Sequence, residues 1–179
     1  AGTSTADSLS LTSAGAITDG STSLSVTNNA SFSGTSIAIG GAGIPTNFGS
    51  LTFNSTGAVT IQEDSDTALA GTSTADSLDL TSSGAITDGS TNLTVTNNAS
   101  FSGTSIAIGG AGITTNFGSL TFNSTGAVTI QEDSDTALSG ANSANSLNLT
   151  SMGAITDATT SLTVTNNASF DGTSISIGG

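Results

Sequence analysis

The sequence predicts an all-β protein that folds as a right-handed parallel β-helix, or β-solenoid. Residues 1–69 return as residues 70–138 with five substitutions, and a partial third copy occupies residues 139–179. Within each copy, apolar and small polar residues alternate in short runs typical of strands, and Gly, Asn, Ser and Asp fill the turns between them. Tandem repeats of this kind indicate a solenoid, in which each unit buries its apolar face against its neighbours, and parallel connections are right-handed.

Each complete repeat divides into three coils, and each coil joins three short alternating runs. The expected coils of the first repeat are residues 9–26, 30–48 and 51–69. Coils then start at positions 9, 30, 51 and 78, so the third coil is the longest. The prediction is therefore about 21–27 residues per coil and three coils per 69-residue repeat, with the two complete copies and the partial one forming a single continuous solenoid.

Differences between the copies indicate which side chains face outward. Strand side chains alternate between the two faces, so positions that vary between inward aliphatic residues should be exposed. Leu9 and Leu11 are expected inside, and Phe32 and Phe53 are expected to stack because they occupy equivalent positions of successive coils. The positions expected outside are Ser10 with Asp79 and Asn148, Ser25 with Thr94 and Thr163, and Ala38 with Ala107 and Ser176.

Composition excludes several classes of function. The chain contains no Lys, Arg, His or Cys, and its 13 Asp and Glu give a formal charge of −13, which repels nucleic-acid phosphates and anionic lipid surfaces. We therefore expect no nucleic-acid binding. Because no apolar run is long enough to span a membrane, we also expect no membrane insertion. Because Tyr and Trp are also missing, most catalytic side chains are absent. We therefore expect no enzyme, no catalytic residues and no cofactor.

Three segments of the first repeat carry a resemblance to a known family. Residues 9–18 (LSLTSAGAIT), 24–27 (LSVT) and 57–61 (GAVTI) resemble the repeats of filamentous-haemagglutinin-like adhesins and related giant bacterial surface proteins. This resemblance implies a right-handed parallel β-helix that serves as an exported fibre, stalk or adhesin shaft. The near-identical copies and the lack of basic residues depart from the common pattern and suit a scaffold better than a receptor-binding tip.

The leading interpretation is a structural protein at the cell surface or outside the cell. Open strand edges at the ends of a parallel solenoid favour self-association into a filament or continuation within a longer solenoid chain. The alternative interpretation is an adhesin segment that binds Ca²⁺ or associates with a cell-surface glycan.

Carboxylates are the first candidate site. The densest acidic cluster recurs in the second repeat, as Glu63, Asp64 and Asp66 and then as Glu132, Asp133 and Asp135. Ca²⁺ prefers oxygen ligands from such loops, but clusters on every third coil cannot share ligands along the rod. A solvated turn is the favoured interpretation, and no metal ligands are assigned. The same carboxylates are weak candidates for a general acid and base, because nothing basic or aromatic accompanies them to hold a sugar.

Other polar residues have simpler structural interpretations. Asp19 and Asp88 are expected to cap strand ends at turns, and Asn28 and Asn29 to form hydrogen bonds near a corner of the solenoid. N-glycosylation and O-linked glycosylation of Ser and Thr both stay open. The N-glycosylation motifs lie at Asn29, Asn54, Asn92, Asn98, Asn123, Asn148 and Asn167.

Outward threonine pairs are reminiscent of the flat threonine rows of ice-binding solenoids. The pairs are Thr94 with Thr96 and Thr163 with Thr165. Ice binding needs such pairs on successive coils, and the neighbouring coils carry Ala, Ser or turn residues instead. The preference of Thr for exposed strand positions explains the pairs better.

Overall fold

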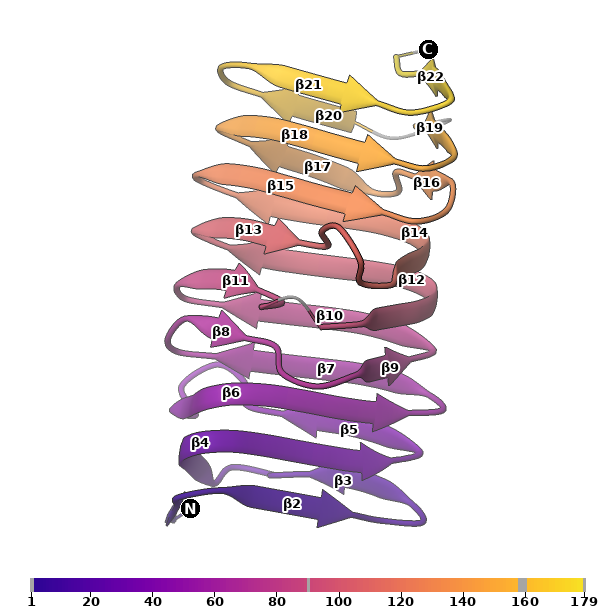
Figure 1. The fold of residues 1–179 in the computed structure, drawn as a ribbon. Helices are drawn as coiled ribbons and strands as arrows, with labels where there is room; N and C mark the ends of the chain where they lie inside the picture. The colour runs from indigo at the N-terminus through magenta and orange to yellow at the C-terminus, as the bar shows by residue number, and fades with distance from the viewer. Residues whose placement is uncertain (1, 90, 158–160, 179) are drawn as a thin grey trace.

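A computed structural model describes residues 2–89, 91–157 and 161–178 of the protein. These residues form parallel strands stacked as a β-solenoid of about 8 turns, with no helix in the described ranges. Figure 1 shows the coils rising from the N-terminus to the C-terminus as a single rod. The predicted all-β parallel solenoid is confirmed.

The strands of the first repeat are β1 (Thr3–Ala6), β2 (Leu9–Thr12), β3 (Ala16–Thr18), β4 (Ser23–Gly34), β5 (Ser36–Ile39), β6 (Thr46–Ser55), β7 (Ala58–Glu63) and β8 (Thr67–Ala68). Those of the second repeat are β9 (Ser73–Ala75), β10 (Ser77–Ser82), β11 (Ala85–Thr87), β12 (Leu93–Gly103), β13 (Ser105–Ile108), β14 (Thr115–Ser124), β15 (Ala127–Glu132) and β16 (Thr136–Ala137). The partial copy contributes β17 (Ala141–Ala144), β18 (Ser146–Ser151), β19 (Ala154–Thr156), β20 (Ser161–Val164), β21 (Ala168–Asp171) and β22 (Ser174–Ser176).

Two long strands in each complete repeat turn a corner of the solenoid. In the pairing of β4 with β6, the register shifts between Val26 and Asn29, so each strand covers two sides of a coil. The corresponding strands of the second repeat, β12 and β14, show the same shift between Val95 and Asn98. Eight strands, two of which count twice, give ten sides per repeat. Sides three apart along the chain lie on neighbouring coils, as the pairing of β1 and β2 with β4 and of β3 with β5 shows.

Ten sides make three complete coils and one further side, which changes the expected register. Leu78 was expected above Leu51 at the start of a new coil, but it pairs with Val59 on β7. Ile17, Ile37, Val59 and Leu78 form one column with nearly even spacing along the chain, so the long third coil of the prediction is wrong. Three complete coils per repeat are therefore present, but the extra side was missed.

The extra side turns each repeat by one third of a coil relative to the previous one. Strands β3, β11 and β19 share the sequence Ala-Ile-Thr, yet they belong to three different sheets, of 13, 6 and 3 strands respectively. Identical sequence positions in successive copies therefore lie on successive faces of the rod.

The core is a continuous stack of aliphatic and aromatic side chains along the axis of the rod. Phe32 and Phe53 are opposite each other in register, as predicted, and both are completely buried. The predicted ring stack between them is replaced by a contact of Phe32 with Phe48, whose ring centroids are 5.8 Å apart at an angle of 55°. Burying each such side chain contributes about 1.5–3 kcal/mol.

The inward and outward assignments agree with the alternation of the strands, with one correction. All nine positions predicted to face outward are exposed. Leu11 was expected in the closed core, but its side chain is 40% exposed because β2 belongs to the first coil and is covered on one side only. The equivalent Leu80 is completely buried between β7 and β12.

Candidate functional site

The acidic corner of each complete repeat contains a buried carboxylate. Glu63 continues the inward alternation of Val59 and Ile61 and is completely buried, so its expected place in a solvated turn is wrong. One carboxylate oxygen accepts the Phe48 backbone N–H at 2.7 Å, and the other accepts the Thr67 hydroxyl at 2.7 Å. The Ser65 hydroxyl adds a weaker bond at 3.3 Å. Glu63 thus joins β6 to β8 and to the turn that precedes β8.

Burial changes the acidity of this carboxyl group. Removal from water raises the pKa of Glu63 above its ordinary value of 4.5. The hydrogen bonds from Thr67, Phe48 and Ser65 act in the opposite direction and lower the pKa. Burial raises the pKa of Glu132 in the second repeat in the same way. Its partners are equivalent: the Phe117 N–H at 2.8 Å and the Thr136 hydroxyl at 2.7 Å.

The neighbouring carboxylates accept backbone hydrogen bonds. Asp64 Oδ2 accepts the Thr46 N–H at 3.0 Å, and Asp66 Oδ1 accepts the Ala85 N–H of the next coil at 2.8 Å. Gly84 permits this approach, because an added Cβ would overlap Asp66 Oδ1 and lie 2.9 Å from its backbone nitrogen. The cluster therefore joins successive coils.

This geometry bears on the calcium and acid–base interpretations. Nowhere in the described ranges do three Asp or Glu side chains converge so that they could hold a metal ion. One carboxylate oxygen of Asp64 and one of Asp66 already accept a backbone N–H. Glu63 has no exposed surface through which it could contact a substrate. What the arrangement does chemically is to satisfy backbone N–H groups at a corner.

A second set of carboxylates closes the turns after Ala-Ile-Thr. Asp88 Oδ2 accepts the Gly109 N–H of the next coil at 2.6 Å, and Asp19 accepts the Gly40 N–H at 2.7 Å. In the partial copy, Asp157 accepts the Gly178 N–H at 3.0 Å. The predicted capping role of Asp19 and Asp88 is confirmed, with the cap reaching the neighbouring coil.

Asparagines form polar ladders at the corner within β4 and β12. Asn29 Oδ1 accepts the hydroxyls of Ser50 at 3.0 Å and Thr52 at 3.2 Å, as predicted for a residue near a corner. Asn98 repeats this arrangement in the second copy. These two Asn side chains are half-buried, whereas the other Asn residues in glycosylation motifs are exposed, namely Asn54, Asn92, Asn123, Asn148 and Asn167.

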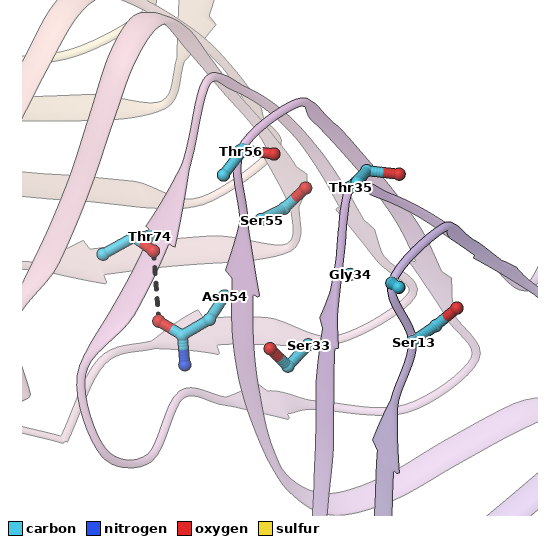
Figure 2. A pocket seen from close by; sticks show the side chains of 9 residues that line it. Ser13, Ser33, Gly34, Thr35, Asn54, Ser55, Thr56 and Thr74 are labelled. Atoms are coloured by element: carbon cyan, nitrogen blue, oxygen red, sulfur yellow. Dashed lines mark hydrogen bonds between the residues drawn. The ribbon is translucent and has the colours of Figure 1, made fainter.

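A shallow groove of about 350 Å³ lies where β4 and β6 end (Figure 2). Hydroxyl groups and one amide line it, among them Ser33, Asn54 and Thr56, and its lining contains no charged or aromatic side chain. The Thr74 hydroxyl donates to Asn54 Oδ1 at 3.0 Å, which leaves the amide N–H groups of Asn54 available to the groove.

The same groove recurs in the second repeat with a volume of about 270 Å³. Its lining residues lie 69 residues after those of the first groove, so that Asn123 replaces Asn54 and Ser143 replaces Thr74. Because each repeat is turned by one side, the two grooves open on different faces of the rod. Sequence reasoning missed them, since their residues are far apart along the chain and typical of any turn.

The threonine pairs do not build a flat threonine row in the structure. Thr94 and Thr96 are exposed, as are Thr163 and Thr165. On the neighbouring coils, Thr94 is opposite Thr74 and Asn116, and Thr74 is followed by Asn54. The column is therefore mixed hydroxyl and amide.

The described residues contain no helix that is long and apolar enough to cross a membrane.

Comparison with known sequences gives one result. Two segments, residues 56–118 and 125–178, match a family described as repeats of unknown function (DUF5649). The matches begin at equivalent positions of successive copies, and together they cover more than half of the chain. No curated protein and no solved structure matches. The chain belongs to the family of DUF5649 repeats.

Proposed function

We propose that this protein is a structural shaft, a segment of an extracellular bacterial fibre, stalk or adhesin stem. One observation carries the proposal: the core runs through the repeat boundaries without interruption. Val59 of the first repeat pairs with Leu78 of the second, and Val128 of the second pairs with Leu147 of the third, all four buried. A chain whose units are joined in this way extends in one direction as copies are added.

The side chains support a passive role. Every described carboxylate at the two kinds of corner accepts a backbone or hydroxyl hydrogen bond, so these acids hold the coils together. The resemblance to giant bacterial surface proteins supports export, and the parallel strand edges support self-association or a longer solenoid.

The length of the rod tests the shaft proposal. Coils are about 4.8 Å apart, so ten sides per repeat predict a rise of about 16 Å for each added 69-residue copy. Chains with two, four and six copies should be measured by small-angle X-ray scattering and electron microscopy. A linear increase of about 16 Å per copy is expected. Compact particles that grow equally in all dimensions would refute the shaft.

The groove favours a second candidate function, the binding of a neutral glycan. Its lining offers uncharged donors and acceptors that match sugar hydroxyls, and it occurs once in each complete repeat. Retention on laminarin and on mannan, two neutral glycans, should be compared with retention on polyanionic alginate. Asn54→Ala with Asn123→Ala should lose retention, whereas Thr60→Ala with Thr129→Ala, on exposed strand positions, should keep it. Equal retention of both double variants would refute the groove as the site.

A further inference from the structure

Each complete repeat contains one completely buried carboxyl group, and the chain offers no basic side chain to pair with it. Glu63 and Glu132 are both completely buried, and the chain has no Lys, Arg or His that could pair with them. Each accepts one backbone N–H and two hydroxyls, so uncharged groups alone solvate the carboxylate. A buried charge held in this way is costly unless it is neutralised.

No neighbouring group compensates the charge of Glu63, and a nearby carboxylate makes it less favourable. β6 contributes Thr46 and Phe48, and β10 places Ser82 opposite Glu63, none of which titrates. The turn after β7 contributes the titratable groups nearest in the chain, Asp64 and Asp66; both are acidic, and the charge of Asp66 acts on Glu63. The surroundings of Glu132 are the same in kind, with Asp133 and Asp135 in the turn and Ser151 opposite on β18.

We propose that these buried glutamates form a proton-dependent brace, one per complete repeat, that makes the solenoid more stable in mild acid than at neutral pH. The brace is the set of bonds by which Glu63 joins Phe48 of β6 to Thr67 after the turn. Protonation removes the buried charge. The carboxylic O–H can then donate to the Thr67 hydroxyl oxygen 2.7 Å away, while the other oxygen keeps the Phe48 N–H. This property goes beyond the proposed shaft function.

The direction of the effect follows from linkage. Burial raises the pKa of Glu63 and Glu132 in the folded protein, so the fold favours the protonated form. The destabilisation is therefore complete above the raised folded-state pKa and absent below the unfolded-state pKa near 4.5. Stability should rise as the pH falls from neutral towards 4.5.

The test compares two double variants of the full chain that remove equal charge. Glu63→Gln with Glu132→Gln replaces the buried carboxyls by amides of the same shape. The control, Asp76→Asn with Asp79→Asn, changes positions at which the third copy already carries Asn145 and Asn148. Thermal unfolding is followed by circular dichroism at pH 7.5, 6.0 and 4.5. These values cover the range from neutral pH down to about the ordinary pKa of a glutamate side chain.

The wild type and the aspartate control should gain about 4 °C or more in Tm from pH 7.5 to 4.5. The glutamine variant should have a higher Tm than the wild type at pH 7.5 and a much smaller gain on acidification. If the glutamine variant keeps the wild-type pH response, or has a lower Tm at pH 7.5, the brace is refuted. Glu132→Gln alone, which leaves Glu63 intact, should give about half of the effect and serves if the double variant fails to fold.

Discussion

The first coils of the first and second repeats have almost the same sequence and very different surroundings. Leu11 on β2 is 40% exposed, whereas its counterpart Leu80 on β10 is fully buried. Gly15 has only the Ser13 hydroxyl near an added Cβ, whereas Gly84 lies against the backbone of Asp66. Each coil of a solenoid needs a neighbour on both sides, so the role of a residue depends on the coil below as much as on its own sequence.

The same contrast appears at the capping aspartates. Asp88 is 4% exposed within the stack, while Asp19 in the first coil is only half-buried. Both accept the N–H of a glycine 21 residues later. Equal hydrogen bonds in unequal burial should differ in their contribution to stability, since water can replace an exposed partner but not a buried one.

The largest effect should come from the leucine pair. Leu80→Asp places an unpaired carboxylate in the buried stack and should cost more than about 4 kcal/mol in the free energy of unfolding, while Leu11→Asp should cost less than about 1 kcal/mol. Urea unfolding measures both. If Leu80→Asp does not fold, Leu80→Ala should still cost about 2–5 kcal/mol. Equal losses at positions 11 and 80 would contradict the described burial.

The glycine pair should give the next largest effect. Gly84→Ala should cost about 1–3 kcal/mol, because the new Cβ meets Asp66 Oδ1 and the Asp66 backbone. Gly15→Ala should have an effect within about 0.5 kcal/mol, since only the Ser13 hydroxyl lies nearby, at 3.8 Å. Both are measured by urea unfolding. A loss at Gly15 as large as that at Gly84 would point to a conformational requirement instead of close packing.

The capping aspartates should differ less. Asp88→Ala leaves the Gly109 N–H without its partner and should cost about 1–3 kcal/mol. Asp19→Ala should cost about half as much, because that corner is partly open to water. Amide hydrogen exchange at Gly109 and Gly40 would locate the change, with faster exchange expected at the uncapped glycine of each variant.

The smallest effect is expected at an outward-facing position where the second copy already carries the new residue. Ser10→Asp reproduces the residue found at Asp79 on an exposed position. We expect a change within about 0.5 kcal/mol by urea unfolding. A loss comparable to that of Gly84→Ala would mean that position 10 is not equivalent to position 79.

Much of the fold follows from the alternation of residues. The inward aliphatic runs and the outward positions could be predicted because successive side chains of a strand point to opposite faces, so the neighbours of a residue indicate its own face. The extra side could not, since β9 is short and its inward residues, Ser73 and Ala75, are small or polar. Without this short side, the pattern of aliphatic residues makes the third coil of the repeat too long.

The site was less predictable than the fold, and the reason differs between residues. The burial of Glu63 could have been read from the sequence, because Val59, Ile61 and Glu63 alternate in phase. The partners of Asp66 and Asp88 lie on the next coil, 19 and 21 residues away, and depend on a register that the missed side displaces. Local patterns give the face of a residue, while contacts between coils need the number of sides.

The turn of one side per repeat has a mechanical consequence. A prism with three chemically different faces bends most easily towards its softest face. In this rod, each segment of the repeat moves to the next face from one copy to the next, as the three Ala-Ile-Thr strands show. Over three copies the differences average out, so a long rod of this sequence should resist bending equally in every direction.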